Sequence, residues 1–256
     1  MEEDNEDSHF RILVNGNMVK YITIEPGLYT EEDMCFSPML MLILPPFPPG
    51  DWNEASVTRD PETSLISFTN VVHRPLVGVT SIWHPNKVDY FDLRLGRKWK
   101  SAVYEAEVLV KDGNSIECFA KYARFELEIT AINYETAAYE CLDGEGIGPA
   151  FLGHLTEHGR VIGFLIEKIP NARHAGPEDL ELCQKALAKL HSLSIKHGDT
   201  NKHNFLISEG RAIIIDFDCA EKCSDRDELE REQQGLVAQL NDTSGRGGWI
   251  PGSYAN

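Results

Sequence analysis

The first clear pattern along the chain is a pair of short apolar runs separated by a turn sequence. The runs cover residues 10–14 and 18–24, and Asn15-Gly16-Asn17 lies between them. Asparagine followed by glycine favours a tight hairpin turn because both residues tolerate positive φ. The pattern predicts a β-hairpin here, preceded by an acidic tail at residues 1–9 that is predicted to be disordered.

A proline-rich segment at residues 38–61 follows the hairpin. Proline fixes φ and removes a backbone donor, so this segment is predicted to be an extended connector or loop. Strand-like apolar runs come next, at residues 64–72 and 76–83. Together these patterns predict a β-rich N-terminal extension over residues 10–85.

The pattern becomes more regular from residue 88 onward. Lys111-Asp112-Gly113-Asn114 has the composition of a turn, and residues 126–142 have apolar positions at helical spacing. Apolar runs of strand length lie at residues 88–95, 102–110, 115–122, 150–155 and 161–167. This order predicts a mainly antiparallel sheet with one helix inserted between its strands.

The C-terminal part of the chain predicts two helices around a short strand pair. Pro177 suits the first turn of a helix that runs to about residue 193. Residues 205–207 and 212–215 read as short strands, and residues 225–240 as a last helix capped by Ser224. The first helix carries one apolar stripe with a spacing of three or four residues, formed by Leu180, Cys183, Leu187 and Leu190.

Composition narrows the class of partner. The chain has 256 residues and a formal net charge of −17, with a pI near 4.9. Such a surface repels nucleic-acid phosphates and anionic lipid headgroups, so neither nucleic acid nor membrane is expected as a partner. The acidic start is not a signal peptide, no apolar run is long enough to span a bilayer, and the scattered cysteines show no disulfide or zinc pattern. We therefore expect a cytoplasmic or nuclear location, with no secretion.

The candidate chemistry is concentrated in residues 197–218. Asp199 and Asn204 lie five residues apart on one predicted loop, and Asp216 follows the second short strand. A hairpin of the two short strands would bring Asp216 back beside Asn204. Phosphoryl transfer needs a carboxylate that orients the attacking hydroxyl and oxygen ligands that hold magnesium against the phosphates. These three side chains supply both.

At this point the chain resembles a known superfamily. The sequence His197-Gly198-Asp199, then Asn204-Phe205, an apolar strand and Asp216-Phe217 resembles the catalytic and metal loops of protein-kinase-like enzymes. The form with His-Gly-Asp, in place of His-Arg-Asp, is similar to RIO-type kinases and to the aminoglycoside and choline kinase group. The resemblance implies that Asp199 is the catalytic aspartate, that Asn204 and Asp216 are magnesium ligands, and that the cofactors are ATP and Mg²⁺.

The same resemblance assigns the residues that bind the nucleotide phosphates from upstream. The strand that ends in Lys121 is similar to the third strand of the superfamily's small lobe, so Lys121 would contact the α and β phosphates. Its ion-pair partner should lie on the next helix. Glu135 is the first choice, and Glu128 is the alternative.

The phosphate-covering loop and the hinge complete the predicted nucleotide site. Residues 94–106 contain a single glycine, Gly96, where the full motif has three, but Ser101 and the three residues after it resemble the end of a RIO-type loop. Gly96 and Ser101 would therefore contact phosphate. In the predicted hinge, Glu167 and Ile169 would flank the adenine. Phe119 stands where protein kinases have alanine above the adenine ring.

We therefore expect an α+β protein with a two-lobed protein-kinase-like fold, a reduced C-terminal lobe and the β-rich extension. The N-lobe is assigned to residues 86–168 and the C-lobe to residues 169–256. The predicted activity is ATP- and magnesium-dependent transfer of the γ-phosphoryl group to a hydroxyl, with protein serine or threonine as the first acceptor.

Two other functions stay open. A small-molecule kinase of the aminoglycoside or choline kinase type is favoured by the His-Gly-Asp form and by the lack of a recognisable activation segment. A catalytically inactive pseudokinase, acting as a binding module, is favoured by the single glycine and by Phe119. The complete set of Lys121, Asp199, Asn204 and Asp216 argues against the pseudokinase.

Overall fold

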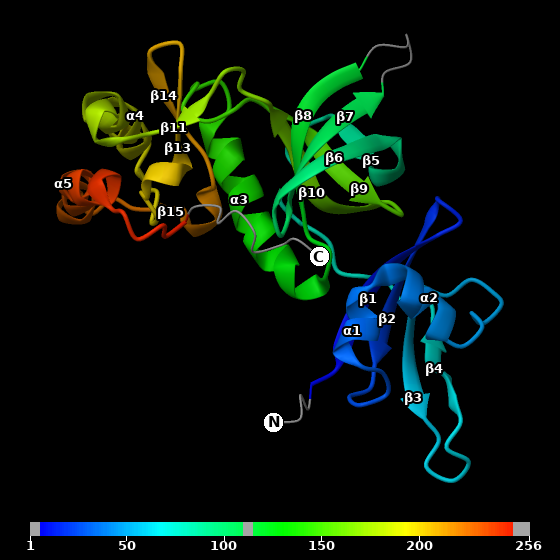
Figure 1. Ribbon diagram of the computed structural model, residues 1–256. Helices are drawn as coiled ribbons and strands as arrows, with labels where there is room; N and C mark the ends of the chain where they lie inside the picture. Colours follow the sequence, from blue (N-terminus) through cyan, green and yellow to red (C-terminus); the bar gives the residue numbers. More distant parts are fainter. Residues whose placement is uncertain (1–5, 110–114, 248–256) are drawn as a thin grey trace. The chain divides into compact units, whose positions relative to one another are not determined.

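The computed structural model describes residues 6–109 and 115–247, and these form two compact units with a boundary between Leu76 and Val77 (Figure 1). The chain has the predicted α+β class, with a β-rich N-terminal region and helices in its C-terminal part, consistent with a kinase-like fold. None of the helices among the described residues is both long enough and apolar enough to cross a lipid bilayer.

The first unit contains one four-stranded sheet with the order β1-β2-β3-β4. Its strands are β1 (Ser8–Val14), β2 (Met18–Ile24), β3 (Glu54–Arg59) and β4 (Ile66–Val72). The hairpin of β1 and β2 is confirmed, with positive φ at Asn15 (52°) and Gly16 (73°). Because β1 begins at Ser8, the last residues of the predicted disordered tail are ordered, and residues 1–5 lie outside the described residues.

The prediction of an extended connector or loop at residues 38–61 is wrong at both ends of the segment and holds for residues 44–53, which have no regular secondary structure. The short helix α1 (Glu31–Cys35) precedes this segment, the short helix α2 (Ser37–Ile43) begins it, and β3 lies near its end. Pro38 lies in the first turn of α2, where its missing N–H costs no helical hydrogen bond. The crossover lets β2 and β3 pair in parallel, and it buries Leu40, Leu44 and Trp52 against the sheet.

The second unit is built on a six-stranded sheet with the order β5-β9-β10-β8-β7-β6. Its strands are β5 (Lys87–Asp89), β6 (Leu93–Lys100), β7 (Val103–Leu109), β8 (Ser115–Tyr122), β9 (Phe151–Glu157) and β10 (Arg160–Glu167). The single strand predicted at residues 88–95 is instead β5, a 3-10 turn η1 (Tyr90–Asp92) and the start of β6. The turn predicted at residues 111–114 lies outside the described residues.

The segment before this sheet differs from the prediction. No strand forms at residues 76–83, where the chain has no regular secondary structure and the N–H of Val79 donates to the carbonyl of Val161 (2.8 Å). This bond lies inside the second compact unit, which begins at Val77, and the predicted domain boundary after residue 85 stays a prediction. The predicted lobe boundary after residue 168 stays a prediction.

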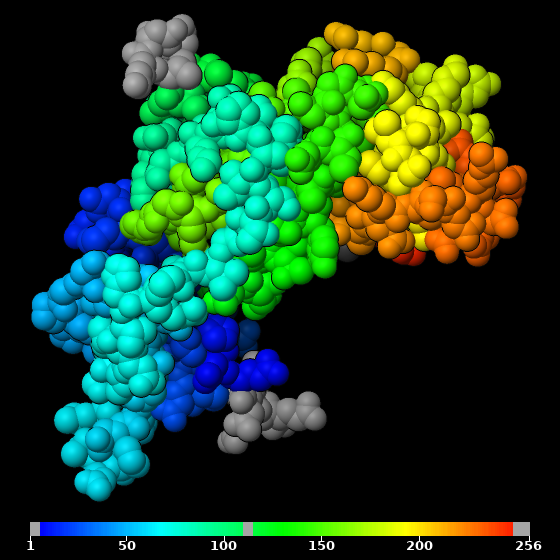
Figure 2. Space-filling model, turned by 180° about the vertical axis from the view of Figure 1, so that it is seen from behind, coloured from blue at the N-terminus to red at the C-terminus, as the bar shows by residue number. Residues whose placement is uncertain are grey.

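Helices flank the sheet on the side of the predicted active site. The 3-10 turn η2 (Glu126–Glu128) leads into α3 (Ile129–Leu142), which packs against β10 and against the turn η5 (Phe217–Cys219). In Figure 2 the green surface of α3 adjoins the yellow and orange surface of the later segments. The turn η3 (Pro177–Asp179) precedes α4 (Leu180–Ser192), whose buried residues Cys183, Leu187 and Leu190 confirm most of the predicted stripe.

The last described helix is α5 (Arg226–Asn241). Its cap is Asp225, not the predicted Ser224: the Asp225 side chain accepts hydrogen bonds from the N–H groups of Asp227 and Glu228. A carboxylate at this position also interacts favourably with the helix dipole. Leu236 and Leu240 are buried and hold the helix in the core beside α4.

The short strands form two small sheets. One has the order β11-β13-β14, and the other pairs β12 with β15. Their bounds are β11 (Arg173–His174), β12 (Ile195–Lys196), β13 (Phe205–Ser208), β14 (Arg211–Ile214) and β15 (Glu221–Lys222). The pairing of β13 with β14 confirms the predicted hairpin after the catalytic loop.

We expect His154 to make the stability of the second unit depend on pH. It is fully buried on β9, and its Nε2 accepts the backbone N–H groups of Trp83 (3.2 Å) and His84 (3.1 Å). Burial lowers the pKa of His154 to about 4. We expect the free energy of unfolding to fall by about 2–3 kcal/mol between pH 7 and pH 4, since only the unfolded chain takes up this proton freely.

Urea unfolding measured across this pH range tests the role of His154. In His154→Gln the amide oxygen still accepts a hydrogen bond but does not titrate, so the pH dependence should flatten by that amount. An equally steep loss of stability in the variant would show that other groups cause it.

Candidate active site

The hairpin of β13 and β14 brings the two predicted metal ligands together. Phe205 pairs with Ile214, and the N–H of Ile215 donates to the carbonyl of Asn204 (2.9 Å). Asn204 therefore precedes one strand at the point where Asp216 follows the other. The apolar strand residues are buried, which fixes the register of the hairpin and hence this juxtaposition.

The catalytic loop has its His-Gly-Asp form for a conformational reason. Gly198 has φ +82°, and a Cβ atom there would lie 2.5 Å from the carbonyl oxygen of Cys219. His197 links the two loops: its Nε2 bonds the carbonyl oxygen of Ile215 (3.1 Å), and its Nδ1 accepts the N–H of Asp199 (3.2 Å). Burial lowers the pKa of His197, so the neutral imidazole acts as a structural cross-link.

Asp199 and Asn204 are in direct contact. The Asn204 Nδ2 donates to the Asp199 carbonyl (2.9 Å) and to Asp199 Oδ2 (3.2 Å), and Asn201 Nδ2 also donates to that Oδ2 (2.9 Å). These bonds orient the Asn204 amide so that its Oδ1, which is buried, has no hydrogen-bond partner among the described residues. A buried amide oxygen without a donor is a suitable ligand for a hard cation.

Asp216 is held in an uncommon backbone conformation. Its φ of 66° and ψ of 65° lie in the left-handed region, which costs a residue with a side chain about 1 kcal/mol or more. The Asp216 carboxylate contacts the ammonium groups of Lys121 and Lys100, the latter at 3.0 Å. Burial would raise the pKa of Asp216, but these two cations outweigh it and hold the pKa well below its usual range.

Glu135 is the residue on α3 that pairs with Lys121. Its Oε2 lies 2.5 Å from Lys121 Nζ, and its Oε1 accepts the N–H of Phe217 at 3.3 Å. The alternative, Glu128, pairs with Arg124 (2.9 Å) and accepts backbone N–H groups at the start of the helix. Desolvation would lower the pKa of Lys121, but the charges of Glu135 and Asp216 raise it, so the lysine is a cation.

Among the described residues, none of the other predicted nucleotide-binding residues forms a hydrogen bond with this cluster. Ser101 is at the tip of the β6–β7 hairpin and accepts a hydrogen bond from Arg124 Nη2 (2.6 Å). Gly96 lies farther back in β6 against Glu105. Glu167 and Ile169 line a separate cavity of about 340 Å³ near the end of α3. Their contacts with adenine and phosphate stay predictions.

Two residues of the site were missed by the sequence analysis. Lys100 had a signal, because it is the last of a run of basic residues in the segment expected to cover the phosphates. Glu232 had none: it lies on α5 and accepts the backbone N–H groups of His197 (3.1 Å) and Gly198 (2.7 Å). This carboxylate therefore anchors the catalytic loop from a distant helix.

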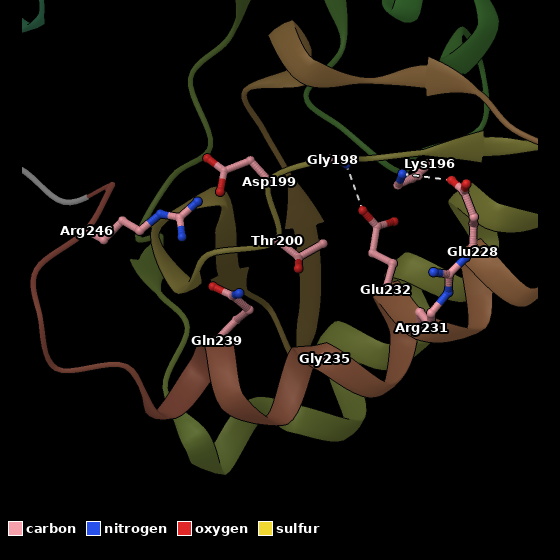
Figure 3. A pocket seen from close by; sticks show the side chains of 10 residues that line it. All are labelled: Lys196, Gly198, Asp199, Thr200, Glu228, Arg231, Glu232, Gly235, Gln239 and Arg246. Atoms are coloured by element: carbon pink, nitrogen blue, oxygen red, sulfur yellow. Dashed lines mark hydrogen bonds and ion pairs between the residues drawn. The ribbon is translucent and has the colours of Figure 1, made fainter.

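A polar cavity of about 390 Å³ adjoins Asp199. Figure 3 shows that its wall is formed by the catalytic loop and one face of α5, and that the guanidinium of Arg246 points toward the side that holds Asp199. Thr200 and Gln239 add uncharged hydrogen-bonding groups. The cavity is thus suited to a small, polar, hydrogen-bonding molecule.

Comparison with known proteins supports a kinase. The model of the lipopolysaccharide kinase (Kdo/WaaP) family matches residues 173–250, the part of the chain that contains Asp199, Asn204 and Asp216. No curated protein matches the chain. In this segment the chain is similar to a kinase family within the protein-kinase-like superfamily, and the similarity indicates that the protein is an ATP-dependent kinase.

Proposed function

We propose that this protein is an ATP- and magnesium-dependent phosphotransferase, and that its acceptor is the hydroxyl of a small molecule bound in the cavity beside Asp199. One observation carries the proposal: Lys121, Glu135, Asp199, Asn204 and Asp216 meet at one place although they come from separate segments of the chain. Each has a chemical type that phosphoryl transfer requires.

Asp199 and Lys121 would have separate roles in phosphoryl transfer. Asp199 orients the acceptor hydroxyl and takes up its proton, and its own orientation is set by Asn201 and Asn204. Lys121 holds the nucleotide phosphates and is itself held by the buried Glu135.

Magnesium would be held by Asn204 Oδ1 and the Asp216 carboxylate, where it would neutralise phosphate charge. The described residues contain no group of three or more His, Cys, Asp or Glu side chains suited to a metal. Magnesium does not need such a group, because one or two protein oxygens plus phosphates and water complete its shell.

The acceptor class is inferred from the surroundings of Asp199. Only the short segment at residues 220–225 connects η5 to α5, and it holds β15, so this connection offers no long platform for a peptide. The cavity of about 390 Å³ lies directly beside the carboxylate. Both features favour a small-molecule acceptor over a protein serine or threonine.

Thermal unfolding with and without millimolar Mg-ATP tests the nucleotide site. Binding to the folded state raises stability by linkage, by about 2.7 kcal/mol at one hundred times the dissociation constant. The shift should require magnesium, should be lost in Asp216→Ala, and should persist in the control Asp92→Ala, whose side chain is exposed in the turn η1. A wild-type protein that shows no shift would contradict the proposal.

Acceptor assays then separate the candidate reactions. Transfer of phosphate to small polyhydroxyl compounds, with none to serine or threonine peptides, is the expected result. Transfer to peptides alone would contradict the small-molecule acceptor and support a protein kinase. A magnesium-dependent thermal shift with no transfer to either panel would favour the pseudokinase.

A further inference from the structure

The β6–β7 hairpin places a lysine at the phosphate end of the predicted nucleotide site. Its turn consists of Ser101 and Ala102, and Lys100 pairs with Val103 across it. Val103 in turn pairs with Lys121 on β8. The register of the three strands therefore aligns Lys100 with Lys121 across β7.

Lys100 and Lys121 bind opposite oxygens of one carboxylate. Lys100 Nζ lies 3.0 Å from Asp216 Oδ2, whereas Lys121 contacts Oδ1. The two lysines differ in their surroundings: the Lys121 side chain is 14% exposed and also pairs with Glu135, while the Lys100 side chain is 47% exposed. Lys121 is thus fixed by a second carboxylate, and Asp216 is the one carboxylate that forms an ion pair with Lys100 among the described residues.

The turn itself lacks the usual means of binding phosphate. A glycine-rich loop binds phosphate with backbone N–H groups, which the absence of side chains allows to approach closely. Here the tip residues Lys100, Ser101 and Ala102 all carry side chains, and Gly96 is packed against Glu105. An ammonium group on a long flexible stem can reach a phosphate where the backbone cannot.

We propose that Lys100 is a second phosphate-binding residue, which contacts the β and γ phosphates of the nucleotide in place of a glycine-rich loop. The proposal rests on the proposed kinase function. Charge supports it, since a cation ligated by Asp216 would repel Lys100 from that carboxylate. The terminal phosphates, bound between Lys121 and Asp216, then become the nearest anion available to Lys100.

Calorimetric titration with ATP, ADP and AMP in the presence of magnesium tests the role of Lys100. In Lys100→Ala we expect the affinity for ATP and ADP to fall by about 5–20-fold, the range of a partly exposed charged hydrogen bond. The affinity for AMP should not change, because AMP lacks both terminal phosphates. Lys100→Arg should retain most of the affinity, and Lys98→Ala, which removes a charge from the same strand, should behave like the wild type.

The outcomes separate this proposal from the kinase function. In one set of outcomes the wild-type protein binds Mg-ATP, while Lys100→Ala either binds ATP equally well or loses affinity for AMP as strongly as for ATP. Either result would show that Lys100 does not bind the terminal phosphates, and the kinase function would stand. If wild-type protein binds no nucleotide, both proposals fail. Unfolding of Lys100→Ala without nucleotide should match the wild type, which excludes loss of fold as the cause.

Discussion

Asp199→Asn is expected to lower the turnover number by about 10³–10⁴-fold, while the affinity for Mg-ATP stays within about twofold. Asparagine has the size of aspartate, and its amide oxygen can accept the hydrogen bonds that Asn201 and Asn204 now donate to Asp199. The loop geometry is therefore retained. The variant loses only the carboxylate charge that orients the acceptor hydroxyl and accepts its proton.

Steady-state kinetics and nucleotide titration on the same preparation measure both quantities. Asp92→Asn is the matched control, since it makes the same chemical change at an exposed position in η1. An Asp199→Asn enzyme that keeps its turnover would remove Asp199 from the chemistry. Loss of nucleotide binding together with turnover would instead assign Asp199 to the nucleotide site.

Lys121→Met is expected to destabilise the fold by about 3–5 kcal/mol in addition to abolishing transfer. The substitution leaves Glu135 without its cation at a place where the Glu135 side chain is only 2% exposed. An unpaired buried charge is costly, whereas a neutral pair in the same space is tolerated. The double variant Lys121→Met/Glu135→Gln should therefore recover most of the stability but none of the activity.

Urea unfolding of the two single variants and the double variant gives the coupling free energy of the pair. We expect strong coupling, with Glu135→Gln alone less damaging than Lys121→Met because it leaves Lys121 paired with Asp216. A double variant as unstable as Lys121→Met would show that the methionine side chain, and not the unpaired glutamate, causes the loss. The nucleotide role of Lys121 would then need its own test.

The parts of the site that the sequence predicted are those set by short stretches of chain. The spacing from Asp199 to Asn204 and the hairpin that returns to Asp216 depend on a few residues and on buried strands with one possible register. The choice of Glu135 over Glu128 depended only on locating the one helix that follows Lys121. The structure places Glu135 against Lys121.

The missed parts depend on contacts between distant segments. Lys100 meets Asp216 across 116 positions of sequence, and this contact follows from the pairing of β6, β7 and β8, which no local pattern reveals. Glu232 reaches the catalytic loop only because the apolar stripe of α5 turns that face inward. The short helix α2 at the start of the proline-rich segment was missed for a different reason, because proline disrupts a helix interior but suits its first turn.

Gly198 also limits how this catalytic loop can be exchanged with others. A side chain at this position would collide with the carbonyl oxygen of Cys219, and φ of +82° disfavours every residue that has a Cβ. A His-Arg-Asp loop therefore cannot be obtained here by one substitution, since the chain through Cys219 would have to follow another path. The His-Gly-Asp and His-Arg-Asp forms therefore require different backbone paths next to the catalytic aspartate. A sequence library that varies Gly198 alone would contain almost no folded active sites.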